Sequence, residues 1–496
     1  MEDWSELARA LAEIAASESA EVREDGEWLA GLSPLRCELR AEGKQPLVHL
    51  WSNERTLTRR VVRVKERTPD RIVLEVQRFG RASPARLELA RSSGARTKGR
   101  VTREQFRGRF ARFLAEKFPD ATVESLTAAP DLENSFSGLY VRGKMREGER
   151  TLAFLGVSPE ENAAAVDGIL AFGLLWLDWT RSHAERRPVE GLRMFLPRGA
   201  GKTVRERVLG VAAGARAEIY EFDEAAGEMR RVDPADAGNL ESWLVSRRDV
   251  EAELRAAREA LARARAALPD SPADAIQLRP TTDAHVVAIC YRGLEFARWS
   301  SQGLFFGLGD SQEPLSTSKE PKFDRLVREL ELHRSPLAEE TNHAMYRAAP
   351  ERWLETLILG APDRLEAALD PAHLYSQVPA MVAGDRGVLD LLGVTRRGRL
   401  VVMELKASED IQLPMQALDY WLRVRRHQQE GSFERFGYFS GVRIDPAPPL
   451  VWLVAPGLRF HPSAEILARY LAPEIQMTRI GLSENWRRGV KVIFRQ

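Results

Sequence analysis

The chain has 496 residues, of which 73 are lysine or arginine and 72 are aspartate or glutamate, so its formal net charge is +1. This balance excludes the bulk basicity of histone-like proteins, so any contact with nucleic acid must use local patches. Two cysteines in a chain of this length exclude a disulfide scaffold and a cysteine-rich zinc site, and they fit a reducing cytoplasm.

The length predicts more than one hydrophobic core. At about 150 residues per domain, the chain corresponds to about three units. The N-terminal segment lacks the basic start and the apolar block of a signal peptide. The longest apolar run, residues 168–177, is too short to span a bilayer. We therefore expect a cytoplasmic protein that does not bind membranes.

Hydrophobic periodicity predicts an α/β protein in which small strand-rich modules alternate with larger mixed domains. Residues 1–30 have the pattern of one or two amphipathic helices, and residues 35–89 have that of strands. After residue 89 the pattern predicts a helix at 106–118, a hairpin at 137–157, a helix at 163–181 and a strand at 191–196.

A charged, alanine-rich stretch at residues 239–267 predicts a long helix that connects two domains, with prolines just beyond its end. Strands at 286–289 and 304–306 and a helix at 323–332 are predicted after it. The predicted organisation is an N-terminal helix with a β-rich module at 1–97, a mixed domain at 98–238, a helical connector at 239–272, a small β-rich module at 273–318 and a second mixed domain at 319–496.

The strongest chemical signal lies in two apolar runs, 387–392 and 400–406, which a short polar turn separates. The first run contains Asp390, and the second ends in Glu404 and Lys406. A β-hairpin would bring these side chains together, because alternate residues of a strand share a face. Such groups inside a sheet cost several kcal/mol in desolvation unless pairing or a metal offsets it. Two acids beside a lysine suit metal-assisted cleavage of phosphodiesters.

The two mixed domains contain an internal repeat. Residues 138–158 align with residues 387–406 when one extra residue is placed in the first turn, and the same order of elements surrounds both segments. The first copy lacks the charged set, so we expect it to be unable to hold a divalent cation. The alignment pairs Val141 with Asp390, Gly156 with Glu404 and Ser158 with Lys406.

Residues 350–456 resemble the PD-(D/E)XK nuclease superfamily, which includes restriction endonucleases, RecB-type nuclease domains and Holliday-junction resolvases. Asp390 matches the motif aspartate, Glu404 the second acid and Lys406 the lysine, while Leu389 replaces the usual proline. The resemblance implies tandem restriction-endonuclease-like domains, each a mixed central sheet flanked by helices, of which the first is degenerate and the second catalytic.

The resemblance also implies three further site residues. It places an acid on the helix before the hairpin, and Glu355 fits better than Glu351 because it lies deeper in the apolar pattern. RecB-like members carry a Gln-x-x-x-Tyr motif on the helix beside the site, which Gln416 and Tyr420 match one helical turn apart.

The implied reaction is hydrolysis that depends on Mg²⁺, with Mn²⁺ as a second candidate ion. Asp390 and Glu404 would hold the ion with the carbonyl of Leu405, and Glu355 would contribute through a water molecule. Lys406 would orient or deprotonate the attacking water. Zinc is not expected, because these ligands are hard oxygens.

Local basic clusters are the expected contacts with nucleic acid, because phosphates require such groups. The cluster that adjoins the site lies at the end of the following helix and comprises Arg423, Arg425, Arg426 and His427. We expect nucleic acid, DNA before RNA, as the partner, and the sequence leaves a homodimer open.

The leading hypothesis is a Mg²⁺-dependent deoxyribonuclease that acts in repair, recombination or defence. The alternative is a non-catalytic scaffold that binds nucleic acid or proteins through nuclease-like domains. A third reading is a P-loop ATPase, since residues 197–203 resemble a phosphate-binding loop, but Leu196 occupies the position of its first glycine. No nucleotide cofactor is therefore expected.

Overall fold

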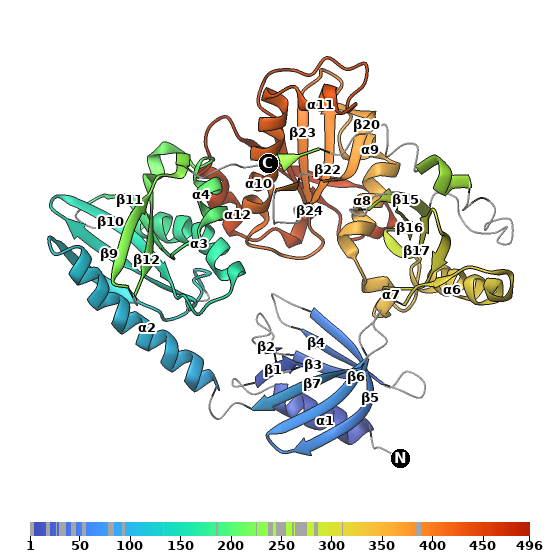
Figure 1. Ribbon diagram of the computed structural model, residues 1–496, viewed down its shortest axis with the longest axis horizontal. Coiled ribbons are helices and arrows are strands. Elements are labelled where there is room, and N and C mark those ends of the chain that lie inside the picture. Colours follow the sequence, from blue (N-terminus) through green and yellow to red (C-terminus); the bar gives the residue numbers. More distant parts are fainter. Residues whose placement is uncertain are drawn as a thin grey trace. The chain divides into compact units, whose positions relative to one another are not determined.

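A computed structural model of the chain divides into two compact units, whose helices and strands are labelled in Figure 1. The first unit comprises Met1–Lys98, Arg247–Ala361 and Asn485–Val490, and the second comprises Gly99–Ser246, Pro362–Glu484 and Lys491–Gln496. The residues that the structure describes are 4–15, 20–25, 27–28, 36–40, 46–51, 56–77, 84–91, 95–131, 133–184, 187–224, 226–236, 242–244, 254–259, 262, 275–281, 286–309, 311–379, 381–382 and 388–496.

The first unit begins with a helix packed on a seven-stranded antiparallel sheet of order β2-β1-β7-β6-β5-β4-β3. Helix α1 (Trp4–Ala15) carries Leu7, Leu11 and Ile14 at helical spacing, and all three are buried in the core of this sheet. The strands are β1 (Ala20–Glu24), β2 (Glu27–Trp28), β3 (Arg36–Arg40), β4 (Leu47–Trp51), β5 (Thr56–Thr68), β6 (Arg71–Gln77) and β7 (Pro84–Arg91).

The prediction of helices throughout residues 1–30 is wrong for its second half. Residues 20–24 form β1, in which Val22 lies opposite Leu89 of β7, and both side chains are buried. The strand is too short for its alternation to stand out beside the strongly amphipathic α1. Pairing with β7, more than sixty residues away in the chain, therefore decides its conformation.

A second antiparallel sheet of the first unit has the order β15-β16-β17-β18-β19. Fully buried Arg334 donates hydrogen bonds to the carbonyl oxygens of Arg292 and Met345 and thereby ties the β16–β17 turn to the segment before α8. The elements are β15 (Ile276–Pro280), β16 (Val287–Tyr291), β17 (Leu294–Ser300), β18 (Gly303–Phe306), β19 (Glu313–Pro314), α6 (Glu320–His333), α7 (Ala344–Arg347) and α8 (Pro350–Gly360).

The second unit contains two six-stranded mixed sheets built on one plan. Their orders are β8-β9-β10-β11-β12-β13 and β20-β22-β23-β24-β25-β26. In both sheets the first three strands are antiparallel, the third to fifth are parallel, and the sixth is antiparallel. The α/β class is thus confirmed, and the predicted repeat extends to the strand topology.

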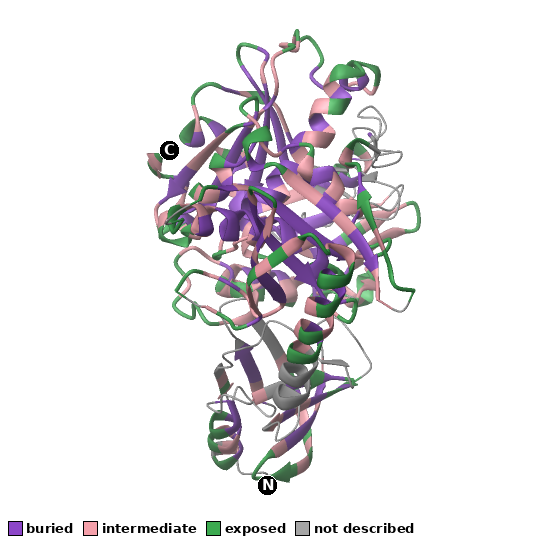
Figure 2. Ribbon diagram, turned by 90° about the vertical axis from the view of Figure 1, so that its left-hand side faces the viewer, coloured by how far each residue is buried: buried purple, intermediate pink, exposed green. Residues whose placement is uncertain are grey.

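The strands of the first of these sheets are β8 (Ala121–Thr127), β9 (Tyr140–Glu147), β10 (Arg150–Val157), β11 (Val189–Pro197), β12 (Ala217–Asp223) and β13 (Glu228–Val232). Those of the second are β20 (Leu369–Pro379), β22 (Val388–Thr395), β23 (Leu400–Leu405), β24 (Leu450–Pro456), β25 (Gln476–Leu482) and β26 (Val492–Arg495). Their central strands are almost wholly buried, as Figure 2 shows in purple.

In each copy a long helix connects the third strand to the fourth, α3 (Ala163–Ser182) in the first and α10 (Leu413–Gln429) in the second. Crossovers between parallel strands are right-handed, so α3 and α10 cover the corresponding face of their sheets. The other helices are α2 (Ala95–Lys117), α4 (Lys202–Val208), α9 (Pro362–Leu365), α11 (Ser432–Arg435) and α12 (Ser463–Arg469).

The predicted connector helix is only partly described. Residues 254–259 are helical, while β14 (Ser242–Trp243), at the start of the predicted helix, is a short strand paired with β21 (Met381–Val382). Most other residues of the predicted connector lie outside the described residues.

The repeat alignment made from the sequence is wrong by one residue. Glu404 lies beside Leu453, which belongs to the core on the α10 side of the second sheet. Gly156 lies beside Phe195, which belongs to the core on the opposite side of the first sheet, where α2 packs. Because neighbouring residues in adjacent strands share a face, Gly156 and Glu404 are not equivalent.

The equivalent residues are those on the α3 side of the first sheet. Leu155 lies beside Met194, as Glu404 lies beside Leu453, and Arg142 lies opposite Leu155. The error has its origin in the turn, because β9 and β10 are joined by a two-residue turn and the first hairpin is shorter, not longer. The corrected pairs are Arg142 with Asp390, Leu155 with Glu404 and Val157 with Lys406.

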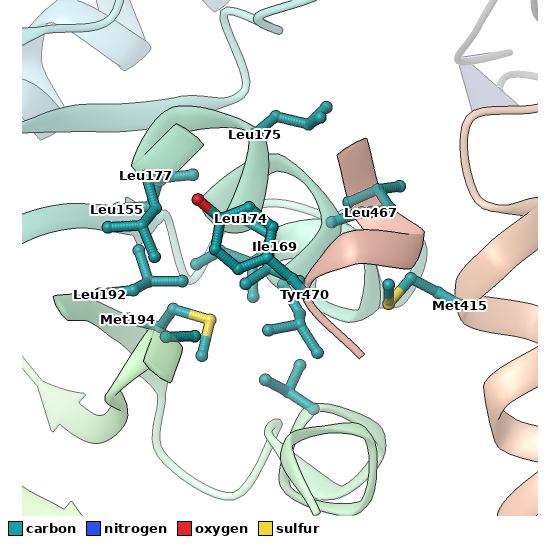
Figure 3. Close-up of a cluster of buried hydrophobic side chains, with 14 of the residues drawn as sticks. Leu155, Ile169, Leu174, Leu175, Leu177, Leu192, Met194, Met415, Leu467 and Tyr470 are labelled. Carbon is teal, nitrogen blue, oxygen red and sulfur yellow. The ribbon is translucent and has the colours of Figure 1, made fainter. Parts of the chain in front are cut away.

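One hydrophobic core joins the two halves of the second unit. It contains Ile169 and Leu174 from α3, Met415 from α10, and Leu467 and Tyr470 at the end of α12, which converge in Figure 3. Within the described part of the chain, α3 is the helix long and apolar enough to cross a bilayer, but 67% of its apolar window is buried. Its hydrophobicity is therefore explained by its place in this core.

Substitution of Gly156 by alanine tests the corrected register. The added Cβ would lie 2.7 Å from the ring of Phe110 on α2, so we expect Gly156→Ala to reduce the free energy of unfolding by about 1–3 kcal/mol. Urea and thermal unfolding measure the change. Gly108→Ala, on the helix that carries Phe110, is the matched control, since its Cβ would meet no heavy atom within 4 Å. Unchanged stability of Gly156→Ala would contradict the assigned face.

Candidate active site

Strands β22 and β23 bring the two predicted acids together at one end of their sheet. The antiparallel register pairs Leu391 with Met403, and one further step places Asp390 opposite Glu404. The Oδ2 atom of Asp390 accepts a hydrogen bond of 3.0 Å from the N–H of Leu405. The predicted hairpin is confirmed, and so is the proximity of the acids.

Glu404 supplies a carboxylate from inside the protein, since the residue is only 4% exposed. Burial raises its pKa well above the usual value, and the charge of Asp390 raises the pKa further, although Lys406 acts in the opposite direction. The Oε2 atom is buried without a hydrogen-bond partner. An unpartnered buried oxygen is costly, so the position favours a proton or a bound cation.

Lys406 lies between two carboxylates. Its Nζ atom is 3.5 Å from Oε1 of Glu404 and 3.6 Å from Oδ2 of Asp410. Glu404 and Lys406 thus share a face, as the alternation predicts. Asp410 is not among the residues predicted from the sequence, although its position four residues after Lys406, in an acidic loop, is a usable signal. The two acids fix the ammonium group beside the site.

Helix α10 places the predicted tyrosine beside the acids. Burial raises the pKa of Tyr420, and the nearby charges of Glu404 and Asp390 raise it further. The hydroxyl therefore remains protonated and able to donate a hydrogen bond at neutral pH. Gln416 lies one turn earlier, and its Oε1 atom is buried without a hydrogen-bond partner. The Gln-x-x-x-Tyr motif thus supplies two polar groups from one face of the helix.

Glu355 belongs to the first unit, where α8 carries it. Its Oε2 atom accepts a hydrogen bond of 2.9 Å from Arg352 and lies 3.4 Å from Nη2 of Arg279. The residue is 1% exposed, and these two arginines balance its charge within that unit. Its participation in the metal site remains a prediction.

The basic cluster at the end of α10 is largely engaged within its own domain. Arg425 donates hydrogen bonds to a glutamine side chain and a proline carbonyl, and Arg426 pairs with an acid one turn later. His427 is 3% exposed and is not part of a surface patch. Arg423 lies over the ring of Tyr420 at 5.9 Å, which makes it the member of the cluster closest to the site.

The oxygen donors of the site fit a hard divalent cation, although no group of three or more His, Cys, Asp or Glu side chains that could hold a metal occurs among the described residues. Mg²⁺ needs only one or two carboxylates and completes its shell with water and substrate oxygens. Asp390 and the unpartnered Oε2 of Glu404 would be these carboxylates if an ion bound here. The carbonyl of Leu405 lies on the same edge of β23 as its N–H, which points to Asp390.

In the first mixed sheet of the second unit, the position equivalent to Asp390 is occupied by a positively charged side chain, that of Arg142. Arg142 is 5% exposed, and its Nη2 atom donates a hydrogen bond of 2.7 Å to the carbonyl of Ala129. Its guanidinium lies over the rings of Phe136 and Trp176, at 5.0 and 5.4 Å. Leu155 lies opposite Arg142, so these two residues stand where the second sheet has Glu404 and Asp390. The first copy therefore lacks the ligands of the second.

No protein-family model matches the chain, and a search of curated proteins finds no relative.

The pH dependence of stability tests the burial of Glu404. The pKa of Glu404 is higher in the folded state than in the unfolded state, so protonation of this group stabilises the fold. This stabilisation is complete below the unfolded-state pKa of about 4.3. It is lost as the pH rises through the folded-state pKa. In the presence of a chelator we expect Glu404→Gln to have a higher Tm than the wild type at about pH 8, with a smaller difference at about pH 5.

Thermal unfolding at both pH values provides the measurement, and Glu434→Gln, at an exposed acid on α11, is the control. Added Mg²⁺ should raise the Tm of the wild type more than that of Glu404→Gln. A Glu404→Gln protein that is less stable than the wild type at the higher pH would contradict a desolvated carboxylate.

Proposed function

We propose that this protein is a metal-dependent nuclease that hydrolyses phosphodiester bonds, with DNA as the favoured substrate. The observation that carries the proposal is the buried, unpartnered Oε2 atom of Glu404, which lies on a strand opposite Asp390 and next to Lys406. A metal site requires a free oxygen of this kind beside a second carboxylate, and the charge of Asp390 acts directly on Glu404.

We also propose that both halves of the second unit are restriction-endonuclease-like domains, one catalytic and one degenerate. The shared strand order and the acid-bearing hairpin followed by a crossover helix support this assignment. The replacement of the two acids by Arg142 and Leu155 supports the loss of chemistry in the first half.

The roles of the residues follow from their positions. Asp390, Glu404 and the carbonyl of Leu405 would hold Mg²⁺ or Mn²⁺. The bound ion supplies Lewis acidity at the phosphate and lowers the pKa of a water ligand. Lys406, fixed 3.5 Å from Glu404, orients or deprotonates the attacking water and offsets negative charge that develops on the phosphate.

The α10 side chains extend the site toward the substrate. Tyr420, kept protonated by its surroundings, can donate a hydrogen bond to a phosphate oxygen. Gln416 can orient a water molecule or the scissile phosphate through its amide. Arg423, beside the tyrosine ring, contributes positive charge for the nucleic-acid backbone.

The resemblance of the Asp390–Lys406 motif to PD-(D/E)XK nucleases favours DNA as the substrate, in repair, recombination or defence against foreign DNA. The second candidate is a non-catalytic scaffold. Arg142 favours that role for the first half, since a buried guanidinium in place of the acid excludes a cation there.

Alanine substitution of the motif tests the proposal. We expect Asp390→Ala and Lys406→Ala each to reduce kcat for Mg²⁺-dependent cleavage by about 100-fold or more, because each removes a group that acts on the developing charge. The assay uses linear, circular, single-stranded and branched DNA, and RNA, with Mg²⁺, Mn²⁺ or chelator. Circular dichroism and Tm verify that the variants are folded.

Glu434→Ala, which removes an exposed acid of the same unit, is the control and should retain full activity. Wild-type protein that cleaves none of these substrates would favour the scaffold. Full activity in either motif variant would refute the assigned residues.

A further inference from the structure

We propose that the degenerate half holds the catalytic half in its active arrangement, and that Arg207 of α4 is the positioning residue that acts on helix α10. This inference rests on the proposed function, because it concerns the geometry of the same site. It assigns a role to a domain that has no chemistry of its own.

The contact between the halves is a bidentate ion pair. Arg207 Nε and Nη2 donate to the two carboxylate oxygens of Asp419 at 2.8 and 2.7 Å, and Nη1 donates to the carbonyl of Asp167 on α3 at 2.7 Å. The side chains of Arg207 and Asp419 are only 7% and 15% exposed. A forked, buried pair fixes both distance and direction, which a single exposed ion pair does not.

Asp419 lies in the middle of the site-forming part of α10. It directly precedes Tyr420 and is three residues after Gln416, so a rotation or shift of the helix at this point moves both groups. The neighbouring Leu418 packs into the first half so closely that a Cβ added at Gly210 would lie 2.4 Å from it. The side of α10 that carries Leu418 therefore packs against the first half.

The first half provides a fixed base for this contact. The segments that follow α4 and α12 occupy equivalent places in the two halves, and they meet in an antiparallel bridge between Val211 and Leu471. Hydrogen bonds of 2.8 and 2.9 Å lie on either side of the bridge. The halves therefore pair about an approximate two-fold axis, with the common hydrophobic core beneath.

Packing alone would hold the helices together, but apolar contacts do not define the rotation of α10 as the carboxylate fork does. A helix that is correctly packed but free to turn slightly would leave Tyr420 and Gln416 misplaced relative to the acids. Small misplacements of this kind reduce kcat more than they change KM.

The test compares a broken pair with an apolar replacement. Arg207→Met leaves the Asp419 carboxylate buried without its partner and should lower the Tm. The double variant Arg207→Met/Asp419→Leu replaces the pair by side chains of similar size and should recover the Tm. We expect the double variant still to show a kcat at least about tenfold below wild type with little change in KM, and Arg207→Lys to recover part of the activity.

Arg193→Met is the matched control. Arg193 is as deeply buried as Arg207 and pairs with Glu147 and Glu218 inside the first sheet, away from α10. The Arg193→Met variant should have a lower Tm than the wild type. At a temperature where the variant is folded, its kcat should equal that of the wild type. A double variant with wild-type kcat, or an equal loss of kcat in Arg193→Met, would overturn the positioning role.

Amide hydrogen exchange separates this inference from the proposed function. In the double variant the amides of α10 should exchange faster than in the wild type, while those of the first sheet remain unchanged. Wild-type protein that cleaves nothing defeats the proposed function, yet faster exchange confined to α10 would still support a positioning contact. Unchanged exchange in α10 would overturn it whatever the activity.

Discussion

The confinement of the Glu404 carboxylate inside the second mixed sheet is the constraint on which the proposed site depends. Glu404 lies on a strand that is buried along its whole length, opposite Asp390, and its charge is opposed by both burial and repulsion. The ammonium group of Lys406 offsets part of this cost, and Lys406 also pairs with Asp410. This balance is incomplete without a further positive charge or a proton, and it is on this ground that the site is proposed to bind a cation.

The two halves of the second unit show how one strand order accommodates very different side chains at equivalent positions. Both retain the same strand order and crossover helix. In the first half, Arg142 and Leu155 occupy the positions equivalent to Asp390 and Glu404. Two aromatic rings lie against the guanidinium of Arg142.

Much of the fold and the centre of the site follow from local sequence. The hairpin with Asp390 and Glu404 could be predicted because alternation and a polar turn are local signals. The repeat was recognised, but its register was not, since a difference of one residue in a turn inverts every side chain of a strand. Arg207 and Asp419, which are 212 residues apart, carry no local signal that relates them. Asp410 lies in a loop, where only its spacing of four residues from Lys406 relates it to the site.

The duplication within a single polypeptide has a consequence for assembly. Dimers formed from separate subunits dissociate on dilution, whereas halves joined by the chain meet at a constant effective concentration. The bridge at Val211 and Leu471 is accordingly closed within one molecule, and its occupancy does not depend on how many copies the cell contains. The contact between the two halves therefore persists at any concentration of the protein.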